Sequence, residues 1–237
     1  ISTPVSIVAG IGRAARKGIL IRGGEDLERA GRITAVAFDK TGTLTEGRPQ
    51  LSTIVSMAEG SSEQEVLSWA ASAELASEHP LARPIIEAAG EDAGLPFPEE
   101  FESITGRGIR AVVEDRPVLV GTLQLLRDSG VNVTDSAAEQ LRAMQERGQT
   151  AVAVALDGEL IGLLGIEDSI RTESAEAVNA LRRQGVQQLT MLTGDNEVTA
   201  RAVAAEAGIT DVHAGLLPEE KLEQIRALQA RGHTVAM

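Results

Sequence analysis

The feature that most constrains the fold is a short apolar run, residues 33–38 (ITAVAF), that ends in the polar sequence DKTGTLT. A short run rich in β-branched residues and without polar alternation is typical of a parallel strand covered on both faces. Such a strand needs neighbours that are joined by helical crossovers. Segments that alternate between strand and helix begin only after residue 167. The chain between these two regions is therefore predicted to be an insertion.

The C-terminal third of the chain shows the required alternation. Helices are expected at 171–183, 197–207 and 218–230, and strands at 188–192, 211–214 and 233–237. This βαβα order predicts a parallel sheet with helices on its faces. The strand at 33–38 completes that sheet, so residues 33–47 and 167–237 are expected to form the two parts of one α/β domain.

The insertion, residues 48–166, has a different pattern. Helices are expected at 62–76, 81–89, 123–128 and 135–146, and strands at 101–105, 109–113, 117–120, 151–156 and 159–166. Two pairs of these strands are separated by hairpin-turn signals, Glu114-Asp115 and Asp157-Gly158. The pattern predicts a separate α+β domain with an antiparallel sheet, and two domains fit a length of 237 residues.

Composition argues against several classes of function. The formal charge is −13, and one Trp, three Phe and no Tyr are too few for base-stacking platforms, so no nucleic-acid partner is expected. The absence of cysteine excludes disulfides, thiolate nucleophiles and cysteine-ligated zinc. No apolar run approaches the roughly 18 residues of a membrane helix.

The two ends of the chain suggest a fragment of a longer protein. The first 32 residues begin apolar (ISTPVSIVAGIG) and turn basic (ARKGILIRGG). This order is typical of the point where a membrane helix reaches the cytoplasm, although an ordinary amphipathic helix also fits it. We therefore interpret residues 1–32 as a membrane-helix exit and linker. The C-terminal sequence RGHTVAM stops inside an apolar run.

Candidate catalytic residues follow the predicted strand at 33–38. Asp39 stands at its carboxyl end, where open α/β sheets place their reactive groups. The following loop, which includes Lys40 and Thr41, supplies hydroxyl and backbone N–H groups that can surround a phosphate. A carboxylate in that position can attack phosphorus and become an aspartyl phosphate.

A second polar loop follows the predicted strand at 188–192. It contains Thr193, Gly194 and Asp195 and precedes a helix, whose N-terminal amides favour anions. Further on, Lys221 lies in the first turn of a predicted helix, where the helix dipole gives a cation no advantage. A Lys at this position can neutralise charge on a phosphoryl group, or it can be an ordinary surface Lys.

The stretch DKTGTLT (39–45), the sequence TGD (193–195) and Lys221 resemble the phosphorylation domain of P-type cation ATPases, within the haloacid dehalogenase superfamily. The resemblance implies that Asp39 is the phosphorylated nucleophile and that Thr193 and Lys221 bind the phosphoryl group. Lys40, Gly194 and Asp195 belong to the same motifs and join the candidate catalytic set. The resemblance also implies Mg²⁺, with Asp39 and Thr41 as its protein contacts.

Thr41 also distinguishes a pump from a phosphatase. Soluble phosphatases of this superfamily usually have a second Asp two residues after the nucleophile, as general acid and base, and here that residue is Thr41. Without a carboxylic acid to activate water, an aspartyl phosphate should persist long enough to be coupled to a conformational change. A soluble phosphatase with a large inserted domain remains the alternative function.

The insertion carries a nucleotide-binding signature. Glu74, His79 and Pro80 lie in AELASEHPLARPI, which resembles the Ser-Glu-His-Pro signature of heavy-metal-transporting P-type ATPases. This resemblance implies ATP as cofactor, with Glu74 and His79 in contact with adenine. Two further sequences, ITGRGIRA with Gly106 and Gly108 and VLVGT with Gly121, resemble glycines of the same nucleotide-binding domain. Family members often have Asn after the last glycine, whereas this chain has Thr122.

The expected function is therefore the ATP-binding and phosphorylation unit of a heavy-metal export ATPase at the cytoplasmic face of a membrane. The sequence Ser2-Thr3-Pro4 favours the zinc, cadmium and lead branch over the copper branch, and the transported cation would bind outside this chain. Hinges between the domains are expected near 46–48 and 166–169. A Gly-Asp-Gly-x-Asn-Asp loop with a magnesium-binding Asp is absent, so the fragment could also bind nucleotide without turning it over.

Overall fold

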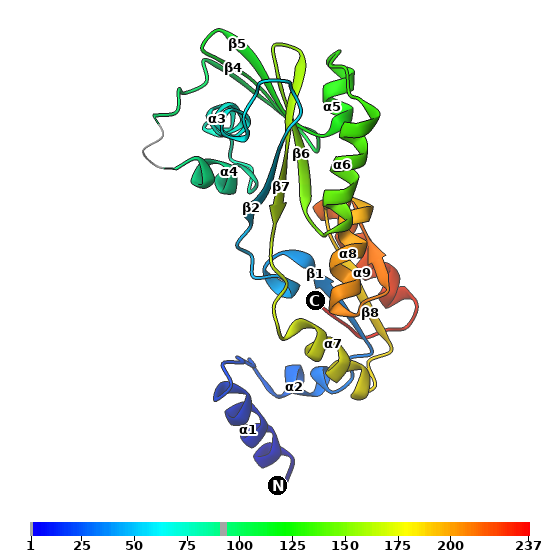
Figure 1. Cartoon of the computed structure of the whole chain (residues 1–237). Coiled ribbons are helices and arrows are strands. Elements are labelled where there is room, and N and C mark those ends of the chain that lie inside the picture. Colours follow the sequence, from blue (N-terminus) through cyan, green and yellow to red (C-terminus); the bar gives the residue numbers. More distant parts are fainter. Residues whose placement is uncertain (1, 91–93) are drawn as a thin grey trace.

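The computed structural model describes residues 2–90 and 94–237 and contains two separate β-sheets (Figure 1). The first sheet consists of four parallel strands in the order β10-β1-β8-β9. Their bounds are β1 Ala35–Asp39, β8 Gln188–Leu192, β9 Asp211–His213 and β10 Val235–Ala236. β1 pairs directly with β8, with Asp39 opposite Leu192. Distant parts of the sequence thus form one sheet, as predicted.

Three helices connect the strands of the parallel sheet: α7 Ser174–Arg183, α8 Glu197–Ala207 and α9 Pro218–Ala230. The core between sheet and helices contains Val178 of α7, Met191 of β8 and Ala200 of α8, all fully buried. The apolar spacing of α7 and α8 places one face of each helix on the sheet and leaves the other in water, whereas α9 buries only Leu228. Together with the parallel strands, these helices confirm the predicted α/β class.

The second sheet is antiparallel and has six strands in the order β2-β7-β6-β5-β4-β3. Their bounds are β2 Gln50–Ser56, β3 Glu100–Ile104, β4 Gly108–Val113, β5 Arg116–Gly121, β6 Thr150–Leu156 and β7 Glu159–Glu167. Helices α3 (Glu63–Glu74) and α4 (Ala82–Ala89) pack on one face, and α5 (Leu123–Asp128) and α6 (Asp135–Glu146) on the other (Figure 1). The predicted α+β insertion with an antiparallel sheet is confirmed.

The two predicted hairpins are present and have the expected turn chemistry. Glu114 and Asp115 have φ angles of 51° and 59°, and Asp157 and Gly158 have φ angles of 51° and 81°. Two consecutive left-handed residues are what a two-residue type I′ turn requires. These turns fix the register of β4 on β5 and of β6 on β7.

The strand β2 was not predicted from the sequence. It pairs with β7, and their register shifts between Leu51 and Thr53. Ser52 lies at this irregularity, and its hydroxyl donates to the carbonyl of Gly165 at 3.1 Å. The polar residues and the shift interrupt the apolar alternation by which a strand is recognised.

The predicted start of the helix at residue 171 was wrong, because α7 begins at Ser174. The N–H of Arg171 donates to the carbonyl of Leu44 at 2.9 Å, and the Ser174 hydroxyl donates to the same carbonyl at 2.7 Å. Tertiary hydrogen bonds to the loop after β1 therefore delay the helix. The predicted strand at 233–237 is also shorter, since β10 covers only two residues, Val235–Ala236.

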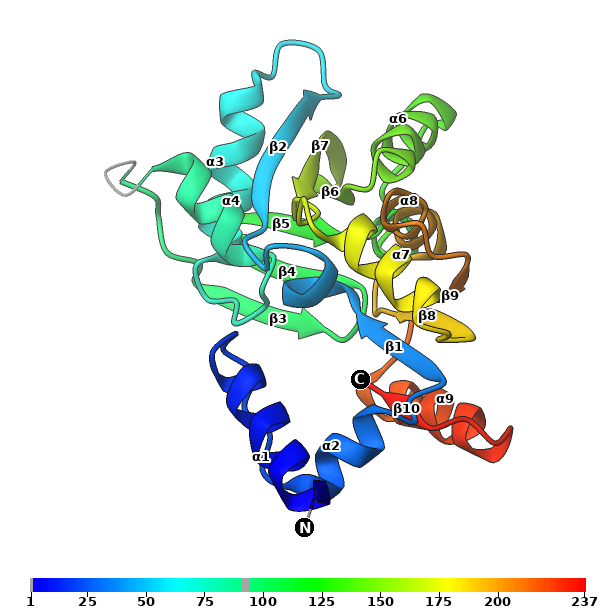
Figure 2. The ribbon, with the colours of Figure 1, turned by 90° about the horizontal axis from the view of Figure 1, so that it is seen from below.

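The N-terminal segment forms α1 (Ser2–Ala15) and α2 (Gly24–Ala30), which pack on each other and project away from both sheets (Figures 1 and 2). In the described part of the chain, every helix is too short or too polar to cross a bilayer. Ile1, the first residue of the apolar opening, lies outside the described residues. The membrane-exit interpretation of this segment stays a prediction.

Candidate active site

The site is built around the loop that follows β1. Asp39 is the last residue of β1, and the chain then makes a wide turn over Lys40–Leu44. The N–H of Thr45 closes this turn by donating to the carbonyl of Lys40 at 3.1 Å, and the N–H of Gly42 donates to the Thr45 hydroxyl oxygen at 3.2 Å. Thr41 and Gly42 have non-helical backbone angles and are exposed. The turn presents the Asp39 carboxylate and the Thr41 side chain at the edge of the sheet.

Two ion pairs connect this loop with the other candidate residues. Lys221 of α9 places its Nζ 2.9 Å from Oδ1 of Asp39, and Lys40 places its Nζ 2.5 Å from Oδ2 of Asp195. The Lys40 side chain is only 8% exposed, so its charge needs the Asp195 carboxylate as a partner. Each carboxylate is therefore balanced by an ammonium group. An incoming anion would meet the partly exposed Lys221 ammonium beside Asp39, whereas the Lys40 ammonium is buried and paired with Asp195.

The loop after β8 is held rigidly at the same edge of the sheet. The N–H of Thr193 donates to the carbonyl of His213 at 3.0 Å, and its hydroxyl oxygen accepts from the N–H of Asp195 at 3.1 Å. Asn196 caps α8, because its side chain accepts from the N–H of Thr199 at 3.0 Å. The neighbourhood predicted for Asp39 and Thr193 thus follows from the pairing of β1 with β8.

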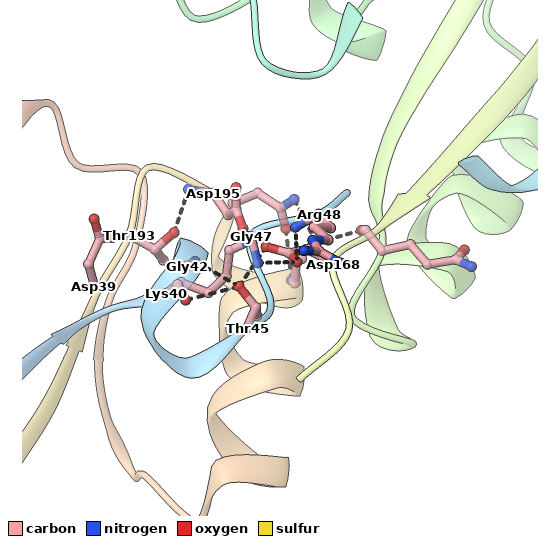
Figure 3. Close-up of polar contacts among 12 residues, drawn as sticks. Asp39, Lys40, Gly42, Thr45, Gly47, Arg48, Asp168, Thr193 and Asp195 are labelled. Carbon is pink, nitrogen blue, oxygen red and sulfur yellow. Dashed lines mark hydrogen bonds and ion pairs between the residues drawn. The ribbon is translucent and has the colours of Figure 1, made fainter. Parts of the chain in front are cut away.

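Asp168 is a site residue that the sequence analysis did not single out. Its Oδ2 accepts from the Thr45 hydroxyl at 2.5 Å, and its Oδ1 accepts from the N–H groups of Gly47 and Arg48 at 2.9 and 3.1 Å (Figure 3). One carboxylate therefore connects the segment that enters the insertion, before β2, with the segment that leaves it, after β7. Asp168 follows β7 directly, as Asp39 ends β1, and this position was the available sequence signal.

Arg171, in the segment between β7 and α7, adds hydrogen bonds to the same junction. Its Nε donates to the carbonyl of Thr45 at 2.9 Å, while the N–H of Glu46 donates to the carbonyl of Ser169 at 2.9 Å. The predicted hinge regions at 46–48 and 166–169 thus lie side by side and exchange hydrogen bonds. The carboxylate and the guanidinium both bind backbone groups here, which a sequence pattern cannot indicate.

A cleft of about 290 Å³ lies between the two sheets and reaches Asp39. From the parallel-sheet part it is lined by Asp39, Lys40, Thr41, Thr193, Gly194, Asp195 and Lys221. From the insertion it is lined by His79 and Pro80, among others. All seven candidate catalytic residues therefore meet two of the candidate nucleotide-binding residues in one cavity.

The His79 ring is oriented by its own backbone. Its Nδ1 accepts from the N–H of Leu81 at 3.2 Å, which leaves Nε2 to carry the proton of the neutral ring. The N–H of His79 donates to the Ser77 hydroxyl oxygen at 3.2 Å. The exposed imidazole therefore offers a donor at Nε2 to a ligand in the cleft.

Glu74 lies deeper than His79, at the end of α3. It is only 6% exposed, and its Oε2 has no hydrogen-bond partner among the described residues. Burial raises the pKa of the Glu74 carboxyl above its ordinary value of 4.5, and a hydrogen bond with Ser77 opposes this shift to a smaller extent. Ser77 thus contacts both candidate adenine residues, although Glu74 itself does not line the cleft.

The three candidate glycines lie away from the lining of this cleft. Gly108 and Gly121 face each other across β4 and β5, and a Cβ on Gly121 would lie 2.3 Å from the carbonyl oxygen of Arg107 and 2.8 Å from Cα of Gly108. Close backbone contact explains why both lack side chains. Gly106 has a φ of 71° and open space where a Cβ would be. Its approach to a nucleotide stays a prediction.

Thr122 has a local role that explains the departure from the expected Asn. Its hydroxyl oxygen accepts from the N–H of Leu125 at 3.2 Å and caps α5. Thr and Asn are both favoured at the N-cap of a helix. The position therefore preserves its structural role with either residue.

Comparison with known proteins gives the family. The family model described as haloacid dehalogenase-like hydrolase matches residues 33–237. The chain belongs to this family.

Relatives narrow the comparison to cation pumps. The chain is 43% identical to a zinc-exporting P-type ATPase of Mycobacterium marinum over 238 aligned residues, covering all of this chain and 32% of the relative. It is also 43% identical to a manganese-exporting P-type ATPase of Mycobacterium leprae, covering all of this chain and 33% of that relative. A crystal structure of a zinc-transporting PIB-type ATPase in the E2.Pi state matches the whole chain with a TM-score of 0.72 and 39% identity, over 38% of its own length. The chain thus spans about a third of the length of these relatives.

Proposed function

We propose that this chain is the ATP-binding and phosphoryl-accepting unit of a heavy-metal-exporting P-type ATPase. The observation that carries the proposal is the cleft that His79 and Pro80 share with Asp39, Thr193 and Lys221. In this proposal residues 48–166 bind the nucleotide, and residues 33–47 together with 167–237 accept the phosphoryl group. Residues 1–32 would connect the unit to a membrane segment.

Adenine would bind at the His79 end of the cleft. His79 offers Nε2–H as a donor to a ring nitrogen. The unpartnered Oε2 of Glu74 is an acceptor for the exocyclic amine, which it would meet only after a local rearrangement, because Glu74 is buried and does not line the cleft. Pro80 and Leu81 supply apolar contact from the same segment. The triphosphate would then extend toward Asp39.

Asp39 would act as the nucleophile. Its carboxylate oxygen forms a bond to the γ-phosphorus, the bond from that phosphorus to the bridging oxygen breaks, and ADP leaves. Lys221, 2.9 Å from Asp39, would bind the transferred group, and Thr193 has a hydroxyl proton to donate. Lys40 and Asp195 would hold the two loops in register. Thr41 provides no general base for water, which favours a persistent acyl phosphate over rapid hydrolysis.

The donor set fits Mg²⁺ bound with few protein ligands. In the described residues no group of three or more His, Asp or Glu side chains could hold a metal alone. Mg²⁺ usually binds one or two carboxylates, substrate phosphates and water. The partly exposed Asp39 carboxylate and Thr41 at the cleft suit this arrangement. When bound, the ion supplies neutralisation of phosphate charge.

The transported cation would bind outside this chain. Zinc, cadmium or lead is the favoured class, and a zinc-exporting relative supports it. The equally similar manganese-exporting relative means that identity alone does not select the cation. The unit would lie on the cytoplasmic side of a membrane, where ATP is available.

Covalent labelling tests this proposal. The chain is incubated with Mg²⁺ and γ-labelled ATP or labelled acetyl phosphate, and an acid-stable, hydroxylamine-labile label is expected on Asp39. Asp39→Asn should carry no label. A label that survives Asp39→Asn would contradict the proposal. Fast metal-dependent hydrolysis of small phosphate esters would favour the soluble phosphatase instead.

A further inference from the structure

A buried hydroxyl connects the phosphate-binding edge to the insertion by a direct hydrogen bond outside the hinge. Thr199, in the first turn of α8, is fully buried, and its Oγ1 donates to the carbonyl oxygen of Gln149 at 2.9 Å. Gln149 directly precedes β6 of the antiparallel sheet. A Thr hydroxyl early in a helix commonly bonds its own helix or cap. Here the donated hydrogen bond leaves the α/β part altogether.

On one side, Thr199 is connected to the loop of candidate catalytic residues. Asn196 donates from Nδ2 to the Thr199 hydroxyl oxygen at 2.9 Å and accepts the Thr199 N–H at 3.0 Å. Asn196 directly follows Asp195, which pairs with Lys40. A displacement of Thr199 would therefore be transmitted to the loop that lines the cleft.

On the other side, Gln149 is connected to the strand that enters the insertion. Its side chain is buried, and Nε2 donates to Ser52 Oγ at 2.8 Å and to Thr53 Oγ1 at 2.9 Å. Ser52 and Thr53 belong to β2, which begins shortly after the Asp168-bound residues. Gln149 thus contacts the α/β part through its backbone carbonyl and β2 through its side-chain amide.

The packing around this hydrogen bond is close. The C-terminal end of α6 packs against α8, as both views show (Figures 1 and 2). Gly148, with a φ of 81°, follows the end of α6, and a Cβ there would lie 3.4 Å from Cγ2 of Val203 on α8. The left-handed glycine lets the chain turn so that the next carbonyl, that of Gln149, meets Thr199.

We propose that Thr199 is a positioning residue that holds the insertion at the angle at which His79 and Asp39 line one cleft. The cleft, about 290 Å³, is at the lower limit of ligand-binding cavities, so a small change of angle would alter whether a triphosphate reaches both ends. This inference rests on the proposed function, because it assigns the nucleotide to that cleft. Loss of one such hydrogen bond should shift the balance between the held and released arrangements by about two- to tenfold.

Distance measurements can test this directly because the chain has no native cysteine. Gln64→Cys on α3 and Gln229→Cys on α9, both exposed, take a donor and an acceptor dye. Thr199→Val removes the hydroxyl at nearly constant volume, and Thr199→Ser restores it. Thr190→Val is the matched control, since buried Thr190 donates to Asp211 at 2.5 Å within the parallel sheet.

The expected result is a broader distance distribution in Thr199→Val and unchanged distributions in Thr199→Ser and Thr190→Val. Calorimetry with Mg²⁺-ATP and with adenosine gives the second readout. Thr199→Val should reduce the advantage of ATP over adenosine by about two- to tenfold while adenosine affinity stays constant, because adenosine does not reach Asp39. Thr190→Val should lower stability without changing this ratio.

A folded Thr199→Val protein with unchanged distances and an unchanged ATP-to-adenosine ratio would overturn the inference. If that variant does not fold, Val203→Ala, which loosens the apolar part of the same contact, must broaden the distances, and an unchanged distribution would be equally decisive. Failure of the wild-type chain to bind either ligand would contradict the proposed function instead. The distance measurement would still decide the role of Thr199.

Discussion

Gly108 and Gly121 are in backbone contact across two neighbouring strands, because a Cβ on Gly121 would lie 2.8 Å from Cα of Gly108 and 2.3 Å from the carbonyl oxygen of Arg107. We expect Gly121→Ala to force β4 and β5 apart and to lower the free energy of unfolding by about 1–3 kcal/mol or more, as overpacking does. The midpoint of urea unfolding measures this loss.

Gly106→Asn is the matched comparison. Gly106 has open space around a Cβ, and Asn tolerates its left-handed backbone, so stability should change by less than about 1 kcal/mol. If Gly106 approaches the nucleotide, ATP affinity should fall in this variant although stability does not. Equal losses of stability in Gly121→Ala and Gly106→Asn would contradict the packing explanation.

Burial of Glu74 predicts a pH dependence of stability. The pKa of the folded-state carboxyl is raised above 4.5, chiefly by burial. Because the folded-state pKa is raised, the protonated Glu74 carboxyl stabilises the folded protein fully below the unfolded-state pKa. This contribution to the free energy of unfolding is lost as the pH rises through the folded-state pKa. Glu74→Gln should therefore raise the free energy of unfolding at pH 8 and remove the part of its pH dependence that Glu74 causes.

Urea unfolding at pH 5 and pH 8 tests the Glu74 prediction. Glu63→Gln, at an exposed position of the same helix, is the control for the loss of a carboxylate. The same change in the free energy of unfolding between pH 5 and pH 8 in wild type and Glu74→Gln would contradict a destabilising effect of ionising the buried carboxyl.

Much of the site could be predicted from the sequence, because parallel strands end at the same edge of a sheet. The apolar runs before Asp39 and Thr193 became β1 and β8, which are direct neighbours. The burial of Lys40 could not be predicted, since a Lys after a strand is ordinarily exposed, and only its tertiary pairing with Asp195 makes burial possible. Asp168 escaped notice because its partners are backbone amides far away in sequence.

In the fold, too, elements with a local sequence signal could be predicted, and elements that depend on tertiary contacts could not. The hairpins could be predicted because their turn residues carry the signal locally. The strand β2 was missed because Ser52 and Thr53 are polar and bind Gly165 and Gln149, contacts that exist only in the folded protein. The start of α7 was placed too early because Arg171 is held by the loop after β1.

Asp168 should control the order of the junction between the domains. In Asp168→Ala the N–H groups of Gly47 and Arg48 lose their acceptor, and the fully buried Thr45 loses a hydrogen-bond partner. Because an unsatisfied buried group costs about 1–3 kcal/mol, local protection should fall. Amide hydrogen exchange at Gly47 and Arg48 should become faster. Asp168→Asn keeps an acceptor oxygen and should lose less protection.

Lys221 should determine binding of phosphate analogues. A charged hydrogen bond contributes about 1.5–3 kcal/mol, so Lys221→Gln should weaken beryllium fluoride binding at Asp39 by about 10- to 100-fold. Arg226→Gln, exposed on the same helix, removes the same charge away from the site and should have little effect. Fluorine NMR titration gives the affinities, and comparable losses in both variants would indicate only a general charge effect.

The most direct test of the shared cleft is a calorimetric titration of Mg²⁺-ATP into the wild-type chain, His79→Ala and Lys221→Gln. Our account predicts saturable binding that both variants weaken, since the two residues line opposite parts of one cavity. Adenosine binding should depend on His79 and not on Lys221. Absence of saturable ATP binding, or ATP affinity independent of His79, would contradict the assignment of the nucleotide to this cleft.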